Sequence, residues 1–248
     1  MLKITLIFLI SILLFTSCNV KNTNEKPISV VINQESQSIA CNTIDDVIFL
    51  GESTTYHIKS RGILAEGKNT KQVWAPKSGT LMLDPTIEDC MIVYPDTNEE
   101  ISLKEAISRK KPKIIFLTFG LNGATNFIAR GDSYFKYCYQ KLIDIISDTS
   151  PNTGIIINSC FPIAKSMDMS RYTVDASVLN SYIDTLNIWA CSIAEKNKAI
   201  FIDTASALKD KDGYLAQQYS VDDGYHLNAE AYRVILNILN NNLQNKEH

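Results

Sequence analysis

Short apolar runs alternate with amphipathic stretches from Asp46 onward. The runs are rich in β-branched and aromatic residues and show no polar alternation; they read DVIFLG, KIIFLTFG, GIIINS and AIFID. Unbroken apolar strands are typical of a parallel sheet that is covered on both faces, because neither face meets water. These runs therefore predict the strands of a central sheet.

Amphipathic stretches lie between and after these runs. The stretch 102–110 begins with Ser102 and Glu105, spaced as in a helix capping box. Apolar residues recur every three or four positions in 132–148, which predicts a helix with one buried stripe. Similar patterns predict helices over 176–197 and 228–243. Alternating strands and helices with right-handed crossovers predict a three-layer α/β/α sandwich with a mostly parallel central sheet.

The first residues follow a different pattern. Lys3 precedes a run of about 12 apolar residues, which is short for a membrane span, and small residues follow before Cys18. This predicts a signal peptide over 1–17. Cys18 resembles the lipidated cysteine of a lipobox, although Phe15 stands where leucine is usual, and a plain cleaved signal or an uncleaved anchor is the alternative.

Each of these interpretations of the leader implies that the rest of the chain is exported. We expect the polar stretch over 18–40 to be a tether, because it has few apolar residues to pack, and 41–248 to be one domain. The expected location is the cell envelope, with a lipid anchor holding the protein to the membrane surface.

The composition limits the kinds of partner and cofactor that we expect for this protein. The chain of 248 residues carries a net charge of −3 and has no basic block, so we expect no nucleic-acid partner. Its six cysteines include no CxxC pair, which argues against a disulfide framework and a zinc site. We therefore expect no metal and no cofactor, and the sequence leaves the oligomeric state open.

Two stretches place glycine, an acidic residue and serine in succession, GES at 51–53 and GDS at 131–133. Ser133 stands at the start of a helical pattern with no strand before it, where short polar side chains accept hydrogen bonds from free N–H groups. We therefore expect Ser133 to cap a helix. Ser53 follows a strand and precedes a helical stretch, which places it at the sheet edge and makes it the candidate nucleophile.

A serine hydroxyl is a weak nucleophile that needs a neighbouring base, most often histidine. The chain has three histidines. His248 ends a polar tail, and His57 has no acidic residue placed to orient its ring, so we expect His57 to be a packed or solvated helical residue.

His226 has a better context, the turn-rich segment SVDDGYHLN. Asp223 lies three positions earlier, and Gly224 permits a tight turn between them. An aspartate there can accept a hydrogen bond from one ring nitrogen and leave the other nitrogen free to take the serine proton. Asp222 competes for this role by proximity alone.

Three short motifs now stand in order: GES after the first strand, GLNG at 120–123 after the second, and DGYH at 223–226. From Asp46 to the last helix, the chain resembles the SGNH, or GDSL-type, hydrolases, whose sandwich is flavodoxin-like. The resemblance implies a catalytic triad of Ser53, His226 and Asp223.

The same resemblance implies an oxyanion hole. Its donors are the N–H of Ser53, the N–H of a glycine and the side-chain amide of Asn122. Gly79 is our choice of glycine, because it lies between the serine and asparagine motifs as the family pattern requires. Glu52 departs from the family's usual aspartate, and Gly123 departs from the aspartate that often follows the asparagine.

The expected function is a serine ester hydrolase that removes small acyl groups, acetyl above all, from a carbohydrate or cell-surface polymer. No long apolar lid is visible, which favours a small acyl group over a fatty chain. Trp74 and the segment 161–175 are expected to border the site, where Trp74 either stacks on a sugar or packs the loop. The alternatives are an acyltransferase with the same triad and a glycan-binding surface lipoprotein without turnover.

Overall fold

The computed structural model describes residues 30–31 and 43–244. The predicted signal peptide, the lipidation site Cys18 and nearly all of the tether lie outside the described residues, as does His248.

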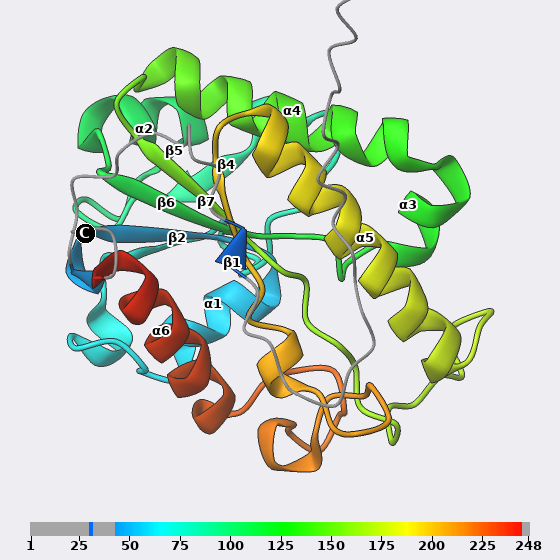
Figure 1. Cartoon of the computed structure of the whole chain (residues 1–248). Coiled ribbons are helices and arrows are strands. Elements are labelled where there is room, and N and C mark those ends of the chain that lie inside the picture. The colour runs from blue at the N-terminus through cyan, green and yellow to red at the C-terminus, as the bar shows by residue number, and fades with distance from the viewer. Residues whose placement is uncertain (1–29, 32–42, 245–248) are drawn as a thin grey trace, which may run out of the picture.

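A central sheet of six strands organises the chain (Figure 1). Its strands in spatial order are β1 (Val30–Val31), β8 (Ile200–Ile202), β7 (Gly154–Asn158), β6 (Ile114–Thr118), β2 (Val47–Gly51) and β3 (Val73–Trp74). All neighbours pair in parallel except β1, which pairs antiparallel with β8. The predicted parallel sheet is confirmed, because the four apolar runs are its four central strands β2, β6, β7 and β8.

The remaining strands were not predicted. The edge strands β1 and β3 have two residues each, too short for a readable pattern. A separate antiparallel pair, β4 (Met91–Val93) and β5 (Glu100–Ser102), lies outside the central sheet.

Helices cover both faces of the sheet and complete the predicted three-layer sandwich (Figure 1). One face packs against α1 (Ser53–Ser60) and α6 (Ala229–Gln244). The other packs against α2 (Leu103–Lys110), α3 (Ala124–Arg130), α4 (Asp132–Thr149) and α5 (Ala176–Lys196). Short 3-10 turns lie at Ile44–Asp46, Gly67–Asn69, Ile87–Asp89, Ser206–Leu208 and Gln217–Tyr219.

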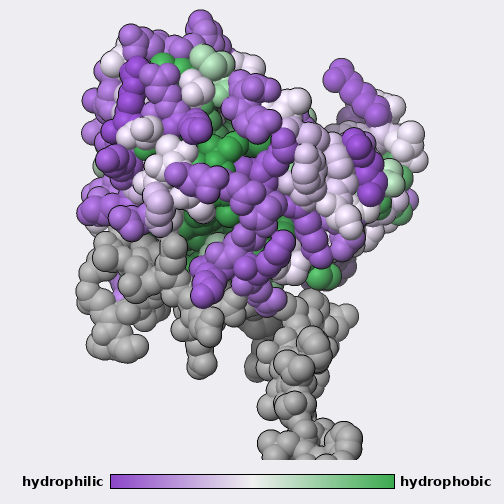
Figure 2. Space-filling view, turned by 90° about the horizontal axis from the view of Figure 1, so that it is seen from above, coloured by the Kyte–Doolittle hydropathy of each residue, from purple (hydrophilic) through white to green (hydrophobic). Residues whose placement is uncertain are grey.

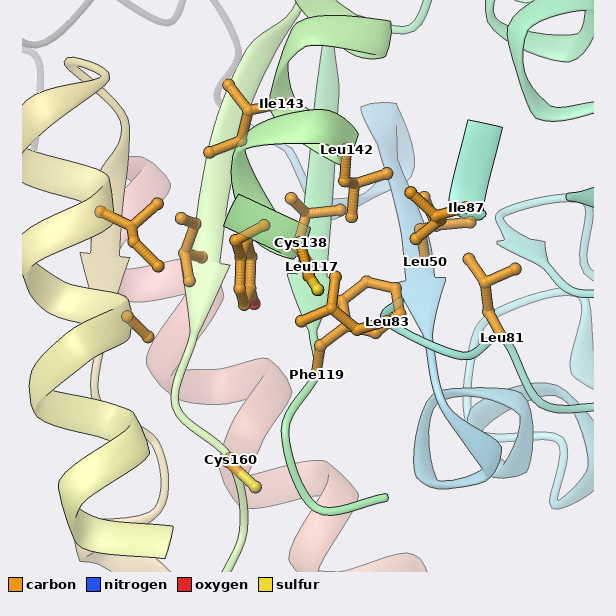
Figure 3. Packing of buried hydrophobic residues seen from close by; sticks show 14 of the residues in the cluster. Leu50, Leu81, Leu83, Ile87, Leu117, Phe119, Cys138, Leu142, Ile143 and Cys160 are labelled. Atoms are coloured by element: carbon orange, nitrogen blue, oxygen red, sulfur yellow. The ribbon is translucent and has the colours of Figure 1, made fainter. Parts of the chain in front are cut away.

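The core has two halves, one on each side of the sheet. Along β2, Val47 and Phe49 face the cluster beneath α1 and α6, while Ile48 and Leu50 face the other cluster. Figure 3 shows part of the second half, to which Leu50, Leu117 and Leu142 of α4 belong. Burying one such leucine stabilises the fold by about 2 kcal/mol. Because such residues pack on both faces of the sheet, they fix the positions of the strands and of the strand ends.

The predicted helices form close to their expected bounds. Ser102 caps α2 by accepting the N–H of Glu105 at 3.1 Å. The helix after Ser53 is shorter than its sequence pattern, because the chain leaves it at Arg61 and Gly62 takes a positive φ of 65°. Sequence reasoning missed α3, whose seven residues are too few for a clear period.

Three described cysteines, Cys138, Cys160 and Cys191, are buried and pack as small apolar residues. The face in Figure 2 is mostly hydrophilic, and apolar residues show mainly between the polar ones. Within the described residues, no helix combines the length and the apolar character that a membrane crossing requires.

Candidate active site

The site lies where β2 and β6 end side by side. Gly51, the last residue of β2, pairs with Thr118, the last residue of β6. A Cβ atom on Gly51 would lie 2.3 Å from Oγ1 of Thr55 and 2.4 Å from the carbonyl oxygen of Thr118. Only glycine fits this close approach, and it brings the turn after β2 against the turn after β6.

Ser53 is the first residue of α1, directly after that turn. Its Oγ lies 3.3 Å from Nε2 of His226, and Nδ1 of His226 lies 2.6 Å from Oδ2 of Asp223. The structure therefore brings these three predicted residues together in one chain of hydrogen bonds, although His226 is 173 positions away from Ser53.

The loop before α6 sets the geometry of Asp223. Its Oδ1 accepts the N–H groups of Tyr225 and His226, both at 2.8 Å, which leaves Oδ2 for the imidazole. Partial burial opposes ionisation of this carboxyl, but these hydrogen bonds outweigh it and lower the pKa of Asp223. Asp222, the competing residue, is exposed, and the Nδ1 of His226 bonds to Asp223 instead.

Gly224 is essential to this loop because it has a positive φ of 68°. A Cβ atom there would lie 2.9 Å from the backbone of Met167, in the segment 161–175. The N–H of Ala164 donates to the carbonyl of Gly224 at 2.8 Å. The segment that we expected to border the site therefore packs directly against the histidine loop.

His57 lies beside His226 in the site. Its ring centroid is 4.5 Å from that of His226, and its Nδ1 is buried without a hydrogen-bond partner in the described structure. Burial, with the nearby His226 and Arg61, lowers the pKa of His57 to about 4. His57 is thus a neutral packing partner for the His226 ring at neutral pH, in line with the expected packed residue.

Asn122 lies in the turn after β6. Its Nδ2 donates to Oγ1 of Thr80 at 3.1 Å, and its Oδ1 accepts the hydroxyl of Tyr225 at 2.6 Å. The side-chain amide is therefore held at both ends beside the Ser53 turn. Sequence reasoning gave no role to Thr80 or Tyr225: Thr80 lies in no motif, and in DGYH only the aspartate and the histidine were read as functional.

Glu52 joins the two turns. Its buried carboxylate accepts the N–H of Gly120 at 2.9 Å and the N–H of Asn122 at 3.0 Å. Burial raises the pKa of Glu52 to about 7, against the lowering effect of these hydrogen bonds. The departure from aspartate therefore gives a side chain that spans from the serine turn to the asparagine turn.

Gly123, the other departure from the family pattern, also has a structural reason. It precedes α3 with a φ of 86°, in the left-handed region that favours glycine. An aspartate would be strained there.

Gly79 does not have the geometry that we predicted for an oxyanion donor. Its N–H donates to the carbonyl of Pro76 at 2.9 Å, so the group already has a partner. The next residue, Thr80, touches Asn122, and within residues 43–244 no hydrogen-bond acceptor lies in range of its N–H. The glycine supplies a turn with a φ of 77°, and Thr80 is the residue that reaches the site.

A pocket of about 400 Å³ opens beside Asn122. Its polar and aromatic lining includes Asn122, Thr125, Tyr172 and Tyr225, and its apolar lining includes Met82. Trp74 is absent from this lining and only 1% exposed, packed against Tyr94. Of its two predicted roles, packing is the correct one.

Within the described residues, no group of three or more His, Cys, Asp and Glu side chains could hold a metal ion.

Ser133 lies at a helix start, as predicted, but its capping role was wrong. Gly131 is the N-cap of α4, and no side chain caps this helix. The Oγ of Ser133 reaches only Oδ1 of its neighbour Asp132 at 3.3 Å, at the exposed surface.

An α/β/α sandwich with serine, histidine and aspartate in hydrogen-bonded sequence at the carboxyl edge of its sheet has the architecture of an acyl hydrolase. The chain matches the GDSL-like Lipase/Acylhydrolase family over residues 89–234 and belongs to that family. It is an ester-bond hydrolase of this class. The matched span contains Asn122, Asp223 and His226, while Ser53 precedes it.

Solved structures share the fold. The chain is similar to a GDSL-like lipase from Bacteroides thetaiotaomicron, with 17% identity, a TM-score of 0.51, and 83% of this chain and 92% of the other covered. It is also similar to an aryl esterase from M. smegmatis, with 14% identity, a TM-score of 0.51, and 80% and 98% covered. At these identities the likeness establishes the fold alone. No curated protein matches the chain in sequence.

Proposed function

We propose that the protein removes small acyl groups, with acetyl as the main one, from a carbohydrate or cell-surface polymer. Ser53 is the nucleophile, His226 the general base and Asp223 the group that orients it. One observation carries the proposal, the hydrogen-bonded chain from Ser53 Oγ through His226 to Asp223 Oδ2, beside the fixed amide of Asn122.

The first half of the reaction acylates the serine. Nε2 of His226 takes the proton of the Ser53 hydroxyl while Oγ attacks the ester carbonyl carbon. The carbonyl oxygen becomes an oxyanion, which the N–H groups of Ser53 and Thr80 and the Nδ2 of Asn122 stabilise; a single such donor is worth about 3 kcal/mol. The C–O bond then breaks, and the leaving alcohol takes the proton from His226.

The second half frees the enzyme. Water gives a proton to Nε2 of His226 and attacks the acyl carbon on Ser53. The same donors stabilise the second oxyanion, and its collapse releases the carboxylic acid and returns the proton to Oγ. Asp223 stays ionised throughout, in agreement with its lowered pKa, and stabilises the imidazolium that forms in each half.

The pocket supports the substrate class. The pocket lies on the Asn122 side of the site, and Ser53 and His226 are not in its lining; its volume of about 400 Å³ suits one sugar unit or a short acyl group, and its aromatic residues Tyr172 and Tyr225 are of the kind that pack against sugars. Because the predicted leader over 1–17 would end before Cys18, we also propose that a lipid on Cys18 anchors the enzyme at the cell envelope, close to such polymers. Mass spectrometry of the mature protein should find a diacylglycerol group on an amino-terminal Cys18; a mature chain with an unmodified Cys18 would contradict the anchor.

Turnover of nitrophenyl acetate tests the catalytic assignment. Ser53→Ala should lose at least about 10⁴-fold in kcat, because the nucleophile is gone. Ser133→Ala is the matched control, since it removes the same hydroxyl from the other glycine-acid-serine stretch, and it should keep wild-type turnover. Equal rates in the Ser53→Ala variant and the wild type would overturn the proposal.

A further inference from the structure

We propose that Tyr225 is a positioning residue for this reaction, because its hydroxyl holds the amide of Asn122 with Nδ2 turned toward the forming oxyanion. This inference rests on the proposed function and deepens it. It concerns a residue inside the DGYH motif that does not itself exchange a proton or touch the reacting atoms.

The geometry of the amide carries the argument. Tyr225 donates its hydroxyl to Oδ1 of Asn122 at 2.6 Å, a short hydrogen bond. An amide is planar, so fixing Oδ1 also fixes the direction of the two N–H groups on Nδ2. One of these N–H groups donates to Oγ1 of Thr80 at 3.1 Å, and Nδ2 also makes a long, weak contact of 4.0 Å with Sδ of Met82, which a charged oxyanion can displace. Without the tyrosine hydroxyl, Oδ1 has no partner to fix it, and the contact of Nδ2 with Thr80 alone holds the amide against rotation.

The protonation state of Tyr225 fits a donor. Burial, followed by the nearby charge of Glu52, raises the pKa of Tyr225 above its ordinary value. The hydroxyl therefore keeps its proton throughout the range in which the enzyme would act. A neutral phenol beside an amide oxygen donates its hydrogen bond in this geometry.

The position of Tyr225 links the two halves of the site. Its N–H donates to Oδ1 of Asp223 at 2.8 Å, the same oxygen that accepts the N–H of His226. Its ring meets the His226 ring edge to face, with centroids 5.0 Å apart. The tight turn that orients the base therefore also orients the oxyanion donor, so the two groups are placed by one loop.

Tyr225→Phe tests this role, since it removes only the hydroxyl. We expect kcat to fall about 10-fold while KM stays within about twofold, because the lost contact matters where charge develops. Asn122→Ala should lower kcat about 10²-fold to 10³-fold. In the Asn122→Ala background, Tyr225→Phe should have no further effect, because no amide remains to be positioned.

Tyr232→Phe is the matched control. Tyr232 donates its hydroxyl to the carbonyl of Thr54 at 2.6 Å, so this variant loses a buried tyrosine hydrogen bond of the same length. It should lower the melting temperature by a similar amount and keep kcat within about twofold of wild type. Should Tyr225→Phe be poorly stable, its affinity for methylboronic acid, which forms a tetrahedral adduct on serine, gives a second measurement, and we expect it to weaken about 10-fold.

The outcomes separate the inference from the proposed function. If Asn122→Ala lowers kcat and Tyr225→Phe does not, the positioning role is overturned and the oxyanion hole stands. If Tyr225→Phe lowers kcat equally with and without Asn122, the hydroxyl acts independently of the amide, which also overturns the inference. Wild-type kcat in Asn122→Ala would remove the oxyanion hole from the proposed function and the positioning role with it.

Discussion

Gly51-Glu52-Ser53 and Gly131-Asp132-Ser133 each place glycine, a carboxylate and serine in succession, and each lies at the start of a helix. The first follows β2 at the edge of the central sheet, whereas the second follows α3 at the surface. Ser53 meets His226 and Glu52 meets the turn after β6. The side chains of Asp132 and Ser133 bond to each other and to Lys136, one turn further along α4.

The two stretches differ in how far along the chain their hydrogen-bond partners lie, and not in the order of their own three residues. Glu52 and Ser53 bond to residues at least 68 positions away. Ser133 reaches only Asp132, and Asp132 pairs with Lys136 one turn further along α4. A parallel sheet gathers distant segments at its carboxyl edge, while a surface helix start offers local contacts alone.

Removing His226, the distant partner of Ser53, should have the largest effect, and this effect is a loss of turnover. His226→Ala should lower kcat about 10⁴-fold or more, because among the described residues His226 alone forms a hydrogen bond with the Oγ of Ser53. Lys136→Ala removes the partner of the other stretch and should leave kcat unchanged. Steady-state rates on nitrophenyl acetate measure both. A His226→Ala enzyme with near wild-type kcat would erase the contrast between the stretches.

The next effect concerns the two glycines. Gly51→Ala should destabilise the fold by about 3 kcal/mol and abolish turnover, because its Cβ would collide with Thr55 and the Thr118 carbonyl. Gly131→Ala meets no atom within 4 Å and suffers only backbone strain at a φ of 85°, about 1 to 2 kcal/mol. Urea unfolding and kcat together check this pair. A Gly51→Ala enzyme with normal stability and kcat would show that the close approach of the turns is unnecessary.

Glu52 and Asp132, the carboxylates of the two stretches, should differ in how they make the free energy of unfolding depend on pH. Folded Glu52 keeps its proton up to a pKa of about 7, whereas the unfolded side chain releases it near the ordinary glutamate pKa of 4.5. Glu52 therefore destabilises the folded state progressively as pH rises from 4.5 to 7, by up to about 3 kcal/mol. Glu52→Gln should remove this pH dependence.

The control for this prediction is Asp132→Asn. Asp132 is exposed and screened by water, so its replacement should keep the wild-type pH dependence. Urea midpoints from pH 4.5 to 8 compare the three proteins. The same pH slope in Glu52→Gln and wild type would contradict the raised pKa of the buried carboxyl.

The smallest expected effect is that of Ser133→Ala. Because Ser133 caps no helix and its Oγ contacts only the exposed Asp132, we expect a change of at most about 0.5 kcal/mol in the free energy of unfolding. A loss above about 1 kcal/mol would restore the capping role that the sequence suggested.

The sequence predicts the central strands because residues buried on both faces leave an unbroken apolar signal, as along β6 and β7. It also predicts that Ser53 and Asn122 share one edge, because parallel strands end on the same side. The sequence places the loop that carries His226 at the same edge only through the order of the motifs and the resemblance to a known family.

Other features depend on contacts that no local pattern encodes. Gly79 was a sound choice by position in the chain, but its N–H turns back to Pro76 and Thr80 faces the site. Trp74 looked like a loop aromatic, although it lies in the edge strand β3 and is buried. The contact of Tyr225 with Asn122 spans 103 positions, so only the folded chain reveals it.

Covalent labelling tests the central claim most directly. A fluorophosphonate probe reacts with an activated serine hydroxyl, and peptide mapping by mass spectrometry locates the adduct. We predict an adduct on the peptide that contains Ser53, lost in the His226→Ala variant, and none on the peptide that contains Ser133. An adduct on Ser133, or no adduct on Ser53 in the folded wild-type protein, would contradict the account.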